Sequence, residues 1–237
     1  MKDLKERQKK ILQCLVDEYI KTAQPVSSFD LLERYRLNVC SATIRNDMLV
    51  LTKKKLLYKP YSSAGRIPTT KGYRVYLQEI SKNFSKKSKP KIKIDIAEKE
   101  DLKTSLSKIF KEITRITRNL VIGYLKKEDF LLEEGWKEVL LEPELKNDLY
   151  LKRFLEAVNL IEKRIDVIES KINNDLEVFI GRENPLYRYD DFTLICCKPK
   201  TRNEKVVFTL LGPKRMAYKK NIFLLNELLN EFDKLNV

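Results

Sequence analysis

The first third of the chain places its apolar residues with the spacing of amphipathic helices. Over residues 4–23 apolar positions recur at steps of three and four, which predicts one helix. The serine pair 27–28 can cap a second, short helix over residues 29–35. Ser41 can cap a third helix that runs to about residue 55. Three helices with a tight connection before the third predict a helix-turn-helix.

The segment after the third helix has the pattern of a short two-stranded wing. Residues 56–68 contain two prolines, which bar a regular two-sided sheet, and small residues around Gly65, which permit a hairpin tip. Arg66 is expected near that tip. An amphipathic helix over residues 73–80 can then pack back on the domain. We therefore predict a winged helix-turn-helix domain at residues 1–80.

Beyond a basic linker at residues 81–101, two segments show a sustained seam of apolar residues. Steps of three and four recur over residues 102–120 and again over residues 154–172. This pattern is typical of a helix hairpin or a helical dimer interface, although a core helix can show it over two or three heptads. Both interpretations stay open.

The C-terminal part of the chain becomes strand-like. Runs rich in β-branched and aromatic residues precede a final amphipathic helix, and they lie at residues 176–180, 192–197 and 206–211, with the helix at 217–235. The predicted fold class is α+β: a winged helix-turn-helix domain followed by a helix-rich domain of mixed helix and strand at residues 102–237.

The N-terminal third of the chain differs in charge from the rest. The net charge is +14, and the first 90 residues hold 20 of the 48 Lys and Arg residues but only 8 of the 34 Asp and Glu residues. A basic domain of this kind favours a nucleic-acid partner over a membrane surface, since no basic amphipathic helix accompanies it. No run of about 18 apolar residues is present, and no apolar segment follows the charged N-terminus. We expect a cytoplasmic protein.

The sequence offers no catalytic constellation. It contains 0 His, which removes the commonest general base and the commonest transition-metal ligand. The adjacent carboxylates at 190–191 are interpreted as a solvated turn. The cysteines lack the paired spacing of a zinc site and are interpreted as reduced, buried thiols: Cys14, Cys40, Cys196 and Cys197. We therefore expect no enzyme activity, no metal site and no cofactor.

The third helix carries side chains suited to duplex DNA. Arg45 and Asn46 have the forked donors and acceptors that pair with guanine and with adenine in the major groove. Ser41 and Thr43 suit a phosphate or a thymine methyl group, and Arg66 could enter a minor groove. The basic residues expected to contact phosphates are Lys53, Lys54, Arg66, Lys71 and Arg74.

Several stretches resemble one family of bacterial regulators. Residues 41–48 (SATIRNDM), 63–68 (SAGRIP) and 71–74 (KGYR) are similar to the DNA-binding domain of the heat-inducible transcription repressor HrcA family. Residues 178–186 (VFIGRENPL) and 211–218 (LGPKRMAY) resemble the C-terminal GAF-like domain of the same family. The resemblance brackets nearly the whole chain.

This resemblance implies a cytoplasmic repressor that binds as a dimer to an inverted-repeat operator, the CIRCE element, upstream of chaperone genes. In that family the chaperonin GroEL promotes the active repressor. Family members carry a dimerising domain inserted into the GAF-like domain, whereas the span between residues 125 and 176 here holds only helix-like sequence. The insert is therefore predicted to be absent and the GAF-like domain reduced.

Two further expectations concern the partners. The seam segments at 102–125 and 154–172 are expected to take over pairing of the subunits. The alternative to an operator-binding repressor is a winged-helix module that docks on a protein or an RNA without specific operator binding.

Overall fold

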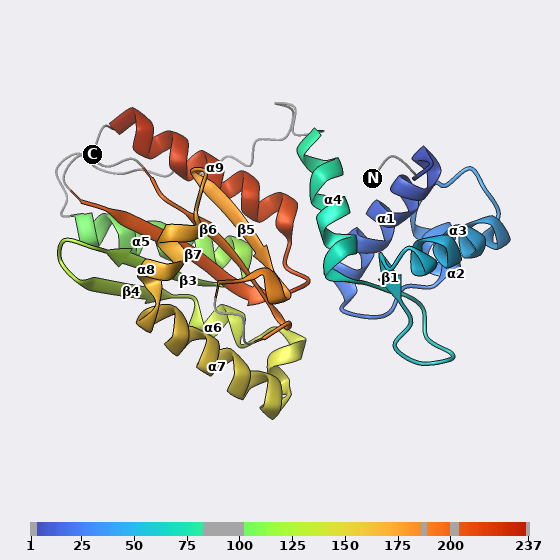
Figure 1. Ribbon diagram of the computed structural model, residues 1–237, viewed down its shortest axis with the longest axis horizontal. Helices are drawn as coiled ribbons and strands as arrows, with labels where there is room; N and C mark the ends of the chain where they lie inside the picture. Colours follow the sequence, from blue (N-terminus) through green and yellow to red (C-terminus); the bar gives the residue numbers. More distant parts are fainter. Residues whose placement is uncertain (1–3, 83–101, 186–188, 200–203, 236–237) are drawn as a thin grey trace. The chain divides into compact units, whose positions relative to one another are not determined.

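Two compact units make up the chain, Met1–Lys87 and Ser88–Val237. The computed structural model describes residues 4–82, 102–185, 189–199 and 204–235 (Figure 1). The predicted basic linker lies almost wholly outside these residues. Within them, no helix is both long enough and apolar enough to cross a bilayer.

The first unit is a helical bundle with a small antiparallel wing. Its two strands are two residues each, and Leu57 and Tyr58 pair with Pro68 and Ile67. The elements follow the order of a winged helix-turn-helix, which confirms that prediction: α1 (Glu6–Thr22), α2 (Ser28–Arg34), α3 (Ser41–Lys53), β1 (Leu57–Tyr58), β2 (Ile67–Pro68) and α4 (Thr70–Lys82).

Apolar side chains from α1, α3 and α4 close the core of this unit. Ile11 and Leu15 of α1, Ile44 and Leu51 of α3, and the ring of Tyr73 on α4 are all fully buried or nearly so. At α2 a capping box sets the start of the helix, because Ser27 Oγ accepts from the Asp30 backbone N–H and the Asp30 carboxylate accepts from the Ser27 N–H.

The second unit is built on one antiparallel sheet of five strands in the order β4-β3-β7-β6-β5. The predicted strands at 176–180 and 192–197 and the predicted final helix are confirmed within a residue. The elements are α5 (Leu102–Thr117), β3 (Leu120–Leu125), β4 (Phe130–Glu134), α6 (Trp136–Val139), a 3-10 helix (Pro143–Lys146), α7 (Asp148–Lys163), α8 (Ile165–Lys171), β5 (Leu176–Ile180), a 3-10 helix (Gly181–Glu183), β6 (Phe192–Cys197), β7 (Val206–Pro213) and α9 (Tyr218–Leu235).

Helices cover both faces of this sheet (Figure 1). On one face Phe110 of α5 and Phe232 of α9 pack against Phe208 of β7, with ring centroids 5.2 and 5.7 Å apart. On the other face Phe154 of α7 packs edge-on against Phe192 of β6 at 5.5 Å. Neighbouring residues of a strand point to opposite faces, so the one sheet can pack against a layer of helices on each side.

The apolar seams belong to this core, so the expectation that they pair subunits is wrong for the described residues. Every position of the second seam is buried in the protomer itself: Phe154, Val158, Ile161, Ile165, Ile168 and Ile172. The first seam packs inward in the same way through Leu106, Ile109 and Ile113. Of the alternatives left open, the core-helix interpretation holds.

Two strands also lie where only helix was predicted. Residues 120–125 form the buried strand β3. Helix α5 ends at Thr117, the next residue, Arg118, has a left-handed φ of 56°, and the apolar run that follows pairs with β4 and β7. The edge strand β4 interrupts the span that was taken as wholly helical. All five of its residues are half-buried, so this strand lacks the alternation of buried and exposed positions from which a strand is predicted.

The thiol prediction fails at one position. Cys14, Cys196 and Cys197 are buried and free, as expected, but Cys40 is exposed. Cys40 is the residue that precedes the first turn of α3, which leaves its side chain outside the core.

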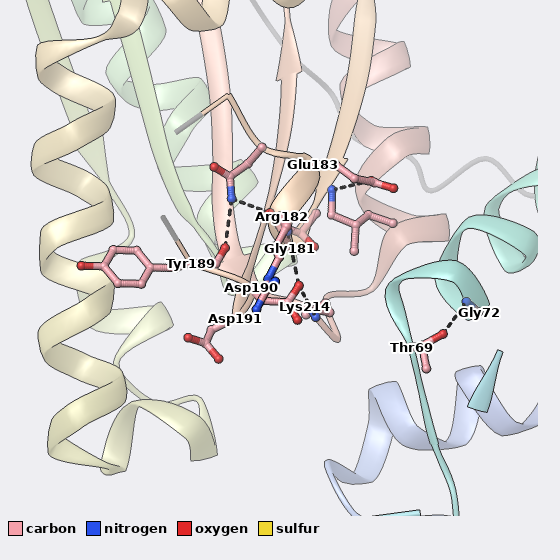
Figure 2. Close-up of polar contacts among 12 residues, drawn as sticks. Thr69, Gly72, Gly181, Arg182, Glu183, Tyr189, Asp190, Asp191 and Lys214 are labelled. Atoms are coloured by element: carbon pink, nitrogen blue, oxygen red, sulfur yellow. Dashed lines mark hydrogen bonds and ion pairs between the residues drawn. The ribbon is translucent and has the colours of Figure 1, made fainter. Parts of the chain in front are cut away.

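A close approach at Gly72 yields a testable prediction. The Gly72 N–H lies in the first turn of α4 and donates to Thr69 Oγ1 at 3.0 Å (Figure 2). A Cβ added at Gly72 would lie 2.1 Å from the Leu56 carbonyl oxygen. Gly72→Ala should therefore lower the free energy of unfolding by about 1–3 kcal/mol despite the better helix propensity of Ala. Urea unfolding followed by circular dichroism measures this. Ser62→Ala, in an exposed turn, is the control, and equal stability of both variants would contradict the prediction.

Candidate nucleic-acid interface

Helix α3 presents one exposed stripe along its whole length. The residues of this stripe are spaced by three and four and lie opposite the buried face formed by Ile44, Asp47, Met48 and Leu51. We define the reading stripe as Ala42, Arg45, Asn46, Leu49 and Lys53, all of which are exposed. The structure thus brings the predicted base-reading pair, Arg45 and Asn46, to one face together.

Ser41 has a different role from the predicted cap. The N-cap of α3 is Cys40, and Ser41 is already the first helical residue. Its hydroxyl lies 3.2 Å from Ser28 Oγ, which joins the starts of α2 and α3. The Ser41 side chain therefore links α2 to α3, and α3 begins one residue earlier than a Ser41 cap would allow.

Thr43 lies beside Cys40 at the same helix end. The Thr43 hydroxyl is 3.3 Å from Cys40 Sγ. This hydrogen bond, together with backbone bonds from the first turn of α3, lowers the pKa of the Cys40 thiol below its ordinary value. By contrast, burial raises the pKa of Cys14 and raises that of Cys196 to about 12.

Arg66 lies at the base of the wing and not near its tip. Its backbone forms an antiparallel bridge with Val26, with N–H···O distances of 2.7 and 3.0 Å. Its guanidinium Nε donates to Thr52 Oγ1 at 3.2 Å, so the side chain lies against the C-terminal half of α3. The prediction placed it wrongly because the bridge joins residues 40 positions apart, which local turn chemistry does not reveal.

The remaining basic residues lie in three places. Lys53 ends the reading stripe, whereas Lys54 and Lys71 line a cavity of about 330 Å³ in the first unit. Lys71 Nζ donates to the Lys54 carbonyl at 3.2 Å. Arg74 is half-buried on α4. Helix α3 has 13 residues and is therefore about 20 Å long. Ser41 lies at its N-terminal end, and Lys54, which lines the cavity, follows its C-terminal end.

The sequence did not single out three residues of this region. Ala42 and Leu49 of the reading stripe would have been found by projecting the third helix onto a wheel. Asp47, between Asn46 and Met48, had no such signal, because burial of a carboxylate depends on its partners in α1.

The paired carboxylates of the second unit lie in a bend before β6, where Asp190 is exposed as expected, and both also form ion pairs. Asp190 accepts from the Arg182 N–H at 3.3 Å and pairs with Lys214 at 2.9 Å (Figure 2). Asp191 pairs with Arg153 of α7 at 3.1 Å. These contacts tie the loop before β6 to its neighbours. Among the described residues, no group of His, Cys, Asp and Glu could hold a metal ion.

Two family models match the chain. The winged helix-turn-helix transcription repressor model, HrcA DNA-binding, covers residues 3–82, and the model of the HrcA protein C-terminal domain covers residues 66–222. Both halves of the chain are thus matched by models of the same family.

Curated relatives agree with these models. A heat-inducible transcription repressor HrcA of Thermosynechococcus vestitus is 51% identical over 78 residues, which are 33% of this chain and 22% of that protein. Its counterpart in Ruminiclostridium cellulolyticum is 38% identical over 130 residues, 52% of this chain and 37% of that protein. The chain therefore spans well under half the length of these relatives.

Two wider matches extend over nearly the whole chain. The HrcA of Thermodesulfovibrio yellowstonii is 24% identical over 331 aligned positions, which cover 94% of this chain and 95% of that protein. The crystal structure of a hypothetical protein at 2.2 Å resolution is 21% identical, covers 99% of both chains and has a TM-score of 0.83. The latter match shows that the fold is shared.

The Cys40 environment generates a prediction. With its pKa lowered, the exposed thiol holds more thiolate near neutral pH than a free cysteine, so iodoacetamide should label Cys40 well before the three buried thiols. Peptide mass spectrometry over a time course measures the rates. Thr43→Val removes the hydroxyl bond and should slow labelling of Cys40 at pH 7. Earlier labelling of Cys14 or Cys196 in the native protein would contradict the assignment.

Proposed function

The chain belongs to the HrcA family of heat-inducible transcription repressors, and we propose that it is itself a sequence-specific repressor of chaperone genes. In this proposal it acts in the cytoplasm and binds an inverted-repeat operator of the CIRCE type as a dimer. The single observation that carries the proposal is the reading stripe of α3, which exposes Arg45 and Asn46 on one face of a winged helix.

The chemistry of the stripe suits the major groove. A guanidinium can donate two hydrogen bonds to guanine O6 and N7, and a carboxamide can pair with adenine N6 and N7. Residues 45 and 46 lie in the second turn of α3, and N-terminal residues are the ones a recognition helix brings to base edges. Arg45 and Asn46 are therefore assigned as the residues that specify sequence.

The other site residues are assigned to the backbone of the duplex. Ser41 and Thr43 lie in the first turn of α3, and the N-terminal end of a helix favours a phosphate. The cationic side chains supply affinity through counterion release, which depends on salt and carries no sequence information. They are Lys53, Lys54, Arg66, Lys71 and Arg74.

The second unit is assigned to dimerisation and regulation as a reduced GAF-like domain. A five-stranded antiparallel sheet with helices on both faces supports that description. Because the apolar seams are used in the core, the subunit interface must use other residues, and Leu140, Leu141 and Leu149 supply exposed apolar surface. The chaperonin GroEL is the proposed regulatory partner, by analogy with the family.

The proposal is tested by comparing two variants of the reading stripe. Arg45→Ala should lose about 1–3 kcal/mol of binding on the operator and relax the preference at one base pair. Lys53→Ala should weaken binding to operator and scrambled duplex alike and reduce the salt slope by about 1. Fluorescence anisotropy on both duplexes at two salt concentrations measures these effects.

Either of two outcomes would contradict this assignment. Equal losses on operator and scrambled duplex for Arg45→Ala would show that Arg45 contacts only the backbone. Weak duplex binding with no salt dependence, in the unsubstituted protein as well, would favour a module that docks on a protein.

A further inference from the structure

One member of the reading stripe is not polar. Leu49 is 43% exposed and lies on the same face as Arg45 and Asn46, one turn further along α3. Met48 and Leu51, on the opposite face of α3, are 4% and 0% exposed and complete the contact of α3 with the core. Leu49 therefore contributes little to the core of the unit.

The position of Leu49 matters more than its exposure, since single exposed leucines are common on protein surfaces. It is flanked on the stripe by the Arg45–Asn46 pair and by Lys53, so any ligand that contacts these three side chains must also cover Leu49. Covering the leucine with a polar surface would not stabilise the complex, whereas covering it with an apolar group removes the apolar surface of both from water, which is favourable.

Duplex DNA displays one apolar group of this kind in its major groove. The C5-methyl group of thymine is the only apolar feature among the hydrogen-bonding groups of the base edges there. At about 1.5 Å of rise per residue, Leu49 lies about 5 Å along the helix axis from Arg45 and Asn46. That distance corresponds to one or two base-pair steps of about 3.4 Å.

We propose that Leu49 is a specificity-determining residue that packs against the methyl group of a thymine, one or two base pairs from those read by Arg45 and Asn46. This inference rests on the proposed function, because it requires α3 to lie in the major groove. Ala42, one turn earlier on the stripe, offers a smaller apolar contact on the other side of the pair.

The test replaces thymidine by deoxyuridine, which lacks only the C5-methyl group of the base. Operator duplexes carry the replacement at one position of each half-site, and anisotropy titrations compare the unsubstituted protein with Leu49→Ala. Loss of one buried methyl group should weaken binding by the unsubstituted protein about fourfold per half-site at one position. Leu49→Ala should bind that duplex and the thymine operator equally.

A matched control uses another exposed leucine of the same unit. Leu32 on α2 is 37% exposed and lies off the reading stripe, so Leu32→Ala should keep the full sensitivity to deoxyuridine. Both variants should remain folded, because neither side chain is buried, and circular dichroism checks this.

The outcomes separate this inference from the proposed function. Specific binding of the thymine operator with no loss at any deoxyuridine position overturns the role of Leu49 and leaves the repressor assignment standing. Persistent sensitivity to deoxyuridine in Leu49→Ala also overturns it. Failure of the unsubstituted protein to distinguish operator from scrambled duplex overturns the proposed function itself.

Discussion

A buried carboxylate determines how α3 lies on the first unit. Asp47 is 4% exposed, and it accepts from Arg7 Nε at 2.6 Å and from Gln8 Nε2 at 3.1 Å, both on α1. Burial alone would raise the pKa of Asp47, but these two hydrogen bonds hold it below its ordinary value. Because an unpaired buried charge is costly, α3 is held to the one rotation that keeps both donors in reach.

The exposed stripe follows from that rotation. With Ile44, Met48 and Leu51 against the core and Asp47 against α1, the remaining face must carry Arg45 and Asn46 outward. The same contact thus serves stability and, in the proposed function, DNA binding, since a turn of α3 about its axis would bury Arg45 and Asn46 and expose the apolar side chains. The wing is tied to the other end of α3 through Arg66 and Thr52.

What the sequence predicts well is what local spacing determines. The periodicity of α1 and α3 and the strand-like runs of β5 and β6 appear at the expected residues. The strand β3 was missed because Leu120 continues the spacing of α5, and the residue that follows the helix in a left-handed conformation, Arg118, is not glycine. The position of Arg66 and the burial of Asp47 were missed because both depend on partners distant in the chain.

The most direct test of the account is selection of duplexes from a random pool by the unsubstituted protein at physiological salt. We expect an enriched inverted repeat, because the proposed dimer would present two copies of the reading stripe related by twofold symmetry. We also expect the strongest preferences at a few adjacent base pairs of each half-site, within the reach of Arg45, Asn46 and Leu49. A pool that stays random while binding remains sensitive to salt would contradict base reading by α3.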